Sequence, residues 1–232
     1  MKNCAVVGWE EGASGQISSW LNYKISFFIH PENKFPYIDK KKAMKRPSRQ
    51  FSIPEKGKYL GKTLICARNW PQELKKRKIK NVLILLSDNK KRLSNINKAL
   101  LNNLNVLSAI HPSVTILGKT IIGKGVIIEP LSYVGYKVEL GNGCWIKTKS
   151  SIDHHTVIKE AAHIGPNVIT GGNCLVGKYS YVNLGSKLLN KVQVGDNSII
   201  GAGSLVMKNI PKNKVAWGSP AEIKKNLKLF QK

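Results

Sequence analysis

Hydrophobic and polar positions repeat with a period of six from Ser113 to Lys208, in sixteen consecutive six-residue blocks without an insertion. The fourth place of every block is aliphatic except at Thr170, and the second place is small or β-branched. A period of six is not helical, so each block is expected to form a short strand with one inward side chain, followed by a bend. Three blocks then make one coil of a stacked, quasi-one-dimensional β-helix.

The chain before these repeats has a different pattern, in which apolar runs alternate with helical stretches. Strands are expected at residues 3–7, 25–29, 63–66, 81–86 and 104–109, and helical segments from about 71 and 87. This alternation predicts a small parallel sheet over 1–109. The basic segment 39–62, broken by Pro47 and Pro54, is predicted to be a surface loop.

The predicted β-helix spans 110–210, and its open end exposes unpaired strands. The last segment, 211–232, is therefore expected to cap that end. Part of it, 219–229, is expected to form a short amphipathic helix.

The composition of the chain indicates the cellular compartment in which the protein works. Its 232 residues are 42% hydrophobic, and its four cysteines are scattered without a close pair. That usage fits a reducing cytoplasm and argues against a disulfide framework. Glu10 and Glu11 come too early for the apolar region of a signal peptide, and no stretch is long and apolar enough to insert in a membrane.

The formal net charge of +25 invites a comparison with nucleic-acid-binding proteins. However, only five of the 38 basic residues are arginine, the residue on which groove reading and phosphate forks depend. No aromatic RNA-binding motif or recognition-helix pattern accompanies the lysines. We therefore expect a solvated lysine surface, or a few lysines that attract phosphate-bearing small molecules, and no nucleic-acid partner.

Candidate chemistry is concentrated in three histidines, His154, His155 and His163. Histidine is the side chain best suited to proton transfer near neutrality. With eighteen residues in a coil, Gly172 is expected to lie directly over His154, leaving space beside the ring and an approachable backbone N–H. His154 and His163 are half a coil apart and face different ways. Either one reaction centre takes a face from a neighbouring subunit, as in a homotrimer with sites between neighbours, or one of the two histidines has a second role.

The segment SSIDHHTVIKEAAHIGPNVITGG resembles the hexapeptide-repeat acyltransferases. Within them it is similar to the branch that N-acetylates nucleotide-linked 4-amino sugars or O-acetylates sialic acids. Gly12 to Gly15 resemble the glycine loop of that branch, 87–89 a later loop, and the tail WGSPA its G-x-P-A motif. The resemblance implies a small Rossmann-like α/β domain that binds a nucleotide sugar, followed by a left-handed parallel β-helix.

The resemblance also implies roles for single residues, with acetyl-CoA as cosubstrate and no metal. His154 would be the general base, assisted by Asp153 or His155, and His163 would hydrogen-bond the acetyl carbonyl or its oxyanion. Gly172 and Ala202, expected at one block position on successive coils, would present backbone to the pantetheine arm. The full set of implied cofactor contacts is His163, Gly172, Leu184, Ala202 and Lys208; the substrate contacts are Gly12, Ser14, Gly15, His30, Asn89 and Lys147.

The chain departs from the family pattern at several of these positions. His155 stands where the family has a carboxylate, and Lys147-Thr148 stands where it often has Asn-Thr. His30, Pro31 and Glu32 replace paired acidic residues, and three residues, Trp9 to Glu11, lengthen the glycine loop. These departures bear on the acceptor more than on the reaction.

The expected function is N-acetylation of a nucleotide-linked amino sugar in bacterial surface-glycan biosynthesis, with O-acetylation of a sialic-acid-type sugar as the alternative. A trimeric zinc β-helix enzyme using His154, His155 and His163 is a remote alternative, because adjacent residues point different ways. A third alternative is a non-catalytic protein that uses a lysine-rich face for assembly or for binding nucleic acid.

Overall fold

The computed structural model describes residues 2–9, 11–35, 54 and 57–227, and the chain divides into two compact units. Unit 1 comprises Met1–Ser87 and Asn97–Leu107, and unit 2 comprises Asp88–Ile96 and Ser108–Lys232. Helix α4 (Asn89–Leu101) therefore contributes its first turns to unit 2 and its last turns to unit 1.

Unit 1 is built around a six-stranded sheet in the order β3-β4-β2-β1-β5-β6, parallel except for the β3–β4 pair. Its strands are β1 (Asn3–Val7), β2 (Lys24–His30), β3 (Lys58–Tyr59), β4 (Lys62–Cys66), β5 (Asn81–Ile84) and β6 (Asn105–Val106). Helices α1 (Glu11–Trp20) and α3 (Trp70–Lys76) also belong to unit 1, as do the last turns of α4. The expected parallel sheet is confirmed, whereas most of the loop expected over 39–62 lies outside the described residues.

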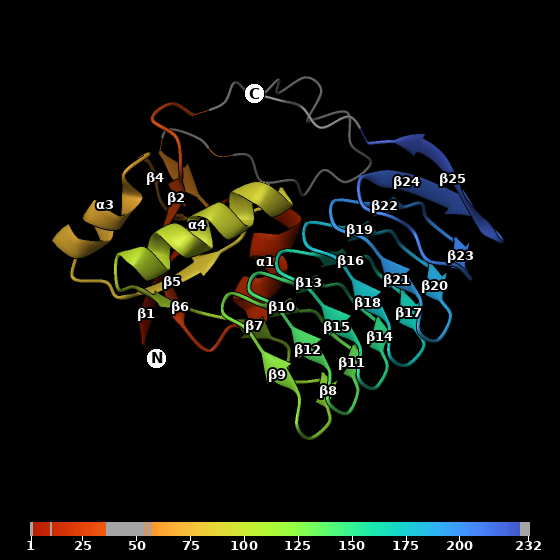
Figure 1. Cartoon of the computed structure of the whole chain (residues 1–232). Coiled ribbons are helices and arrows are strands. Elements are labelled where there is room, and N and C mark those ends of the chain that lie inside the picture. The colour runs from red at the N-terminus through yellow and green to blue at the C-terminus, as the bar shows by residue number, and fades with distance from the viewer. Residues whose placement is uncertain (1, 10, 36–53, 55–56, 228–232) are drawn as a thin grey trace. The chain divides into compact units, whose positions relative to one another are not determined.

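Unit 2 is a parallel β-helix in which every six-residue block forms one two-residue strand (Figure 1). Face 1 contains β7 (Ala109–Ile110), β10 (Ile127–Ile128), β13 (Trp145–Ile146), β16 (His163–Ile164), β19 (Tyr181–Val182) and β22 (Ile199–Ile200). Face 2 contains β8 (Thr115–Ile116), β11 (Tyr133–Val134), β14 (Ser151–Ile152), β17 (Ile169–Thr170), β20 (Lys187–Leu188) and β23 (Leu205–Val206). Face 3 contains β9 (Ile121–Ile122), β12 (Glu139–Leu140), β15 (Val157–Ile158), β18 (Leu175–Val176) and β21 (Gln193–Val194).

The coils stack in register, and strand residues of successive coils pair at a spacing of eighteen, with the exception of Ile152 and Thr170. On face 1, for example, Trp145 pairs with His163 and His163 with Tyr181. Fourth-place side chains such as Ile146 and Ile164 point inward and are fully buried in one continuous core. The coil of eighteen residues predicted from the repeat is confirmed.

Several serines at the second place of a block have a specific hydrogen-bond partner. Ser150, Ser180 and Ser186 each donate their hydroxyl to the backbone oxygen fifteen residues later, at 2.8 Å. Only a short side chain fits this position between two coils. A hydrogen bond of this kind contributes about 1 kcal/mol to stability, while leaving its acceptor unpaired costs more.

The first place of each block adopts a left-handed backbone, and this explains the residue types at the corners. All fifteen first-place residues from Lys119 to Gly203 have positive φ, from 51° at Ala161 to 69° at Gly143. Glycine and asparagine enter this region at low cost, and other residues enter it only where the surrounding structure enforces it. His155, at φ 54°, occupies one of these corners.

The C-terminal helix expected over 219–229 is wrong, because the described part of that segment is a strand. β24 (Lys214–Gly218) pairs in parallel with β22, and β25 (Ala221–Asn226) returns antiparallel beside it. The hairpin extends face 1 by two strands, since β22 at the end of the coils offers free backbone groups that a helix would leave unpaired. None of the helices in the described part of the chain has the length and apolar character needed to cross a membrane.

The inward positions should carry the stability of the β-helix. Leu140, 2% exposed, points inward on β12, and its neighbour Glu139 points outward. Leu140→Ala should lower the free energy of unfolding by about 2–5 kcal/mol because it leaves a cavity in a packed core. Glu139→Ala on the same strand should change it by about 0.5 kcal/mol or less. Chemical denaturation of both variants checks this, and equal effects would contradict the assignment of the inward face.

Candidate active site

The corner between β14 and β15 places His154 and His155 where face 2 turns into face 3. His154 Nδ1 lies 3.0 Å from His155 Nδ1, and the two rings are almost perpendicular. On its other side, the His155 ring packs at 78° against Tyr136, one coil below, with centroids 5.9 Å apart. Asp153 does not hold the His154 ring, because its Oδ1 accepts the backbone N–H of His154 at 2.7 Å.

Gly172 lies directly over the His154 ring, as the eighteen-residue coil predicts. A Cβ atom added at Gly172 would stand 2.5 Å from both Cε1 and Nε2 of His154, so any side chain here would displace the ring. One part of the expectation is wrong: the N–H of Gly172 is not free, because it donates to Oδ1 of Asn190 at 3.2 Å. The glycine therefore leaves room for the ring and for what approaches it, and its N–H is already used.

His163 is on face 1, away from the His154 corner. Its ring stacks on Tyr181 at 4.1 Å and 11°, and lies 5.6 Å from Trp145. Burial, followed by the nearby charges of Arg92 and Lys147, lowers the pKa of His163 from 6.5 to about 3, so the imidazole is neutral. Its Nδ1 is buried and has no hydrogen-bond partner among the described residues.

Arg92 anchors the start of α4 to face 1, and the sequence analysis assigned it no such role. The side chain is fully buried and donates from Nε to Gly143 O at 2.8 Å and from a terminal nitrogen to Ala161 O at 3.2 Å. Arg92 also donates to Asn89 Oδ1 at 2.8 Å, while Asn89 Nδ2 donates to Tyr179 O at 3.1 Å. Asn89, implied as a substrate contact, thus already has both ends of its amide engaged.

Glu129 is a second residue that the sequence analysis missed. It is buried and accepts hydrogen bonds from Trp145 Nε1 at 3.0 Å and from the Thr148 hydroxyl at 2.9 Å. It also forms an ion pair with Lys147, whose ammonium lies 4.9 Å from the centre of the Trp145 ring. Lys147, another implied substrate contact, is therefore neutralised by a buried carboxylate. The spacing of eighteen between Glu129 and Lys147 was the available signal.

The implied cofactor residues fall on two separate edges of the β-helix. Gly172 follows β17 and Lys208 follows β23, so both lie with His154 on the edge between faces 2 and 3. Leu184 follows β19 and Ala202 follows β22, on the edge between faces 1 and 2. The expectation that Gly172 and Ala202 share one position on successive coils is wrong, because they are thirty residues apart and a coil has eighteen. One chain does not bring these residues together.

In unit 1, the segment expected to be a glycine loop is already helix, because α1 begins at Glu11. Gly12, Ser14 and Gly15 lie in its first turns, just after the carboxyl end of β1, where the backbone N–H groups of a helix start favour an anion. The Ser14 hydroxyl is buried without a partner among the described residues. His30 ends β2, and its Nδ1 accepts a hydrogen bond from Trp9 Nε1 at 3.3 Å.

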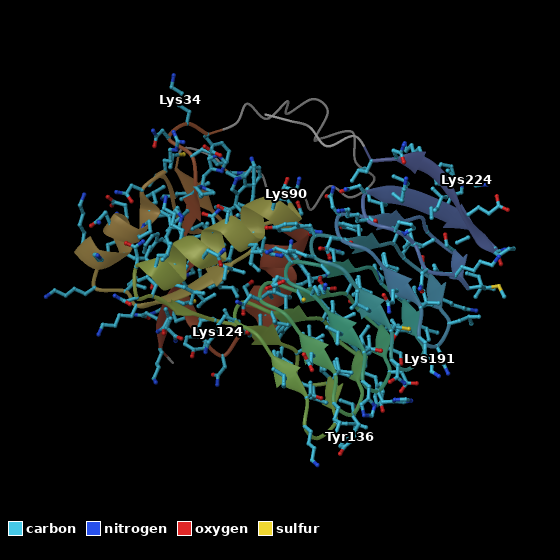
Figure 2. All side chains as sticks on the ribbon, viewed as in Figure 1. Lys34, Lys90, Lys124, Tyr136, Lys191 and Lys224 are labelled. Atoms are coloured by element: carbon cyan, nitrogen blue, oxygen red, sulfur yellow. The ribbon has the colours of Figure 1, made fainter. Side chains whose placement is uncertain are left out.

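Lys124, Lys191 and Lys224 lie at different parts of the β-helix unit (Figure 2). No group of three His, Cys, Asp or Glu side chains in the described ranges is arranged to hold a metal. His163 lies apart from His154 and His155 within one chain, so these three imidazoles do not form a ligand set there.

The chain is similar to solved structures of acetyltransferases over its whole length. Perosamine N-acetyltransferase from Caulobacter crescentus, in complex with CoA and GDP-perosamine, has a TM-score of 0.81 and 21% identity, covering 97% of this chain and 98% of that one. The acetyltransferase domain of PglB from Neisseria gonorrhoeae, in complex with acetyl coenzyme A, has a TM-score of 0.79 and 20% identity, covering 96% and 99%. WeeI from Acinetobacter baumannii has a TM-score of 0.57 and 14% identity, covering 97% and 100%.

No protein-family profile and no curated protein matches the chain. The structural similarity confirms the expected fold, a small N-terminal α/β unit followed by a left-handed β-helix.

The neutral state of His163 makes stability depend on pH. Its pKa is about 3 in the folded chain and near 6.5 when unfolded, so below pH 6.5 the unfolded chain binds a proton that the folded chain does not. The free energy of unfolding should therefore decrease as the pH is lowered from about 6.5 to about 3, by up to about 1.4 kcal/mol per pH unit from this group. His163→Phe, which keeps the stacking on Tyr181, should flatten that slope in denaturant titrations. His111→Asn is the matched control, and an unchanged slope in His163→Phe would contradict the assignment.

Proposed function

We propose that this protein is an acetyl-CoA-dependent N-acetyltransferase that acts on a nucleotide-linked amino sugar. The observation that carries the proposal is the His154 ring held under bare Gly172 at a β-helix edge. The fold is shared with perosamine N-acetyltransferase, which was solved with CoA and GDP-perosamine. The acceptor would carry its amine on a dideoxy sugar, at the 4-position, as the sequence resemblance implies.

In the proposed reaction the neutral amine of the sugar attacks the thioester carbonyl directly. His154 Nε2 takes the proton of the attacking amine, the C–S bond breaks, and CoA leaves as the thiol after it receives that proton. Nε2 faces Gly172, so it is the ring nitrogen available to the substrate. The fold needs no covalent enzyme intermediate for this transfer.

The close approach of the two histidines links the proposed role of His154 to one arrangement of the ring protons. One proton lies between His154 Nδ1 and His155 Nδ1, at 3.0 Å. For Nε2 of His154 to act as a base, that proton belongs to His154, and His155 accepts it as a neutral imidazole. His155 then does the orienting work of the carboxylate that the family has in its place, and Asp153 holds the backbone of the corner.

His163 is suited to bind the acetyl oxygen. A neutral imidazole donates one N–H bond without bringing a charge, and the partnerless Nδ1 shows that its ring is not fully used by the protein. The stacking on Tyr181 keeps the ring orientation fixed before the substrate arrives.

Because the implied cofactor residues lie on two edges, one reaction centre would combine His154 and Gly172 of one subunit with His163, Leu184 and Ala202 of another. We propose a homotrimer with three such sites.

Exposed aliphatic side chains on two of the faces support assembly: Ile121 on face 3 is 62% exposed and Ile169 on face 2 is 44% exposed. Light scattering tests the assembly, and a fully active monomer would contradict it.

Unit 1 is proposed to bind the nucleotide part of the acceptor. The start of α1, with Gly12, Ser14 and Gly15, would face a phosphate, and His30 lies at the same carboxyl edge of the parallel sheet. We place the reaction in the cytoplasm, in the assembly of a bacterial surface glycan.

The substrate class is tested by measuring thiol release from acetyl-CoA with GDP-, UDP- and dTDP-linked 4-amino sugars and with free sialic acid. A nucleotide-linked amino sugar should be the best acceptor. If free sialic acid is far better, the protein is instead a sugar O-acetyltransferase.

His154→Asn should lower kcat by about 10²–10⁴-fold, the usual contribution of a positioned general base, with the β-helix intact. The KM values for both substrates should change little, because the side chain acts on the proton and not on binding. Steady-state kinetics with purified protein gives both values. A crippled His155→Ala combined with a mild His154→Asn would show that the base is His155.

Gly172→Ala tests the space above the base. The added Cβ would stand 2.5 Å from two atoms of the His154 ring, so the ring must move, and kcat should fall with the thioester no longer well placed. Binding of the nucleotide sugar, measured by calorimetry, should stay nearly unchanged. Gly118→Ala, where nothing lies within 4 Å of the new Cβ, is the control and should leave kcat as it is. Equal losses in both variants would contradict this geometry.

A further inference from the structure

Thr170 is the single residue that breaks the aliphatic rule at the inward place of the sixteen blocks. It ends β17 on face 2 and is 2% exposed, within a core of isoleucine, valine and leucine. A hydroxyl in such a core costs free energy unless it makes a hydrogen bond, and an aliphatic residue of equal size would pack as well. The position therefore needs a reason other than packing.

The hydroxyl of Thr170 takes the place of a backbone carbonyl in the ladder between coils. In the described stretch from Leu117 to Leu189, every fifth-place N–H except that of Asp153 donates to the carbonyl seventeen residues later. Asp153 N donates instead to Thr170 Oγ1, at 3.1 Å. The pairing of β14 with β17 is correspondingly reduced to Ser151 and Ile169.

The coils on either side show that this is a local change. On the same edge, the N–H of Gly135 below and of Gly171 above both make the ordinary bond at 2.8 Å, to Ile152 O and Leu188 O. The ladder thus departs from its rule at one residue, and that residue directly precedes the proposed base.

The altered bond continues into the position of His154. Asp153 N is held by Thr170, Asp153 Oδ1 accepts the N–H of His154 at 2.7 Å, and His154 O accepts the N–H of Asn173 at 2.9 Å. A carbonyl acceptor would draw Asp153 into the regular ladder and change the angle at which the corner leaves face 2. The side-chain acceptor instead holds Asp153 N without that carbonyl bond, so the start of this corner is fixed differently from the corners above and below it.

We propose that Thr170 is a positioning residue for the general base, and that its hydroxyl sets the corner so that His154 Nε2 faces the reacting amine. The inference rests on the proposed function, because it assigns a role to Thr170 only through His154. The position of His154 would then depend on one inward hydroxyl in a core that is otherwise aliphatic.

Thr170→Val removes the hydroxyl at constant shape, and Thr170→Ser keeps it. Thr170→Val should lower kcat about 10-fold or more with little change in KM, since a small misplacement of a catalytic group has this effect. Its melting temperature should be equal or higher, because an apolar residue enters the core and the ladder bond can form. Thr170→Ser should retain most of kcat despite a lower melting temperature from the lost methyl group.

Thr120→Val is the matched control, because the Thr120 hydroxyl bonds to Leu117 O at 2.8 Å and to Gly135 O at 3.1 Å and does not take the place of a ladder carbonyl. It should lower stability and leave kcat unchanged. As a second readout, the ¹⁵N shifts of the His154 imidazole, assigned by their loss in His154→Asn, should change in Thr170→Val and not in Thr120→Val.

A wild-type kcat in Thr170→Val, or equal losses in the valine and serine variants, would overturn the proposal. So would a loss of kcat that follows a loss of folded protein. His154→Asn, assayed in parallel, distinguishes a failure of the proposed function from a failure of the positioning role. If His154→Asn remains active, the assignment of His154 as the base is wrong. If it is inactive while Thr170→Val is normal, only the positioning role fails.

Discussion

The stacking of coils at eighteen residues is the constraint on which the rest of unit 2 depends. From Leu117 to Leu189, every fifth-place backbone N–H except that of Asp153 is satisfied by a carbonyl of the next coil, so the register does not slip without breaking a whole ladder. This register brings Gly172 over His154 and places Trp145, His163 and Tyr181 in one column. Residues eighteen apart in the sequence thus become direct neighbours, and residues at larger multiples of eighteen lie in the same column.

The same constraint explains what was predictable. The period of six predicts the β-helix and the contact of Gly172 with His154, because a repeat with a fixed period determines its own neighbours. It does not predict Arg92, which reaches the coils from a helix outside the repeat, or the C-terminal hairpin, which follows the last block. It also leaves open that the Gly172 N–H is taken by Asn190, because a side-chain rotamer has no signature in the repeat.

Two histidines of the candidate site are held in different ways. His163 is neutral because it is buried near the cations Arg92 and Lys147, which is an effect of the environment. His154 is oriented by a direct contact with His155 at a left-handed corner and by a backbone anchored through Asp153. A neutral donor and an oriented base are the two groups that the proposed transfer from a thioester to an amine would use. Within one chain they remain on different parts of the coil.

The central claim, that the base of one subunit works with the cofactor groove of another, is tested by mixing two inactive variants. His154→Asn lacks the base, and Ala202→Trp blocks the proposed groove on the other edge. Co-assembled in equal amounts, they should regain acetyl transfer to about a quarter of the wild-type rate, because about one site in four then combines an intact base with an intact groove. Mixed assemblies that remain inactive, although both chains are shown to be present in them, would contradict the account.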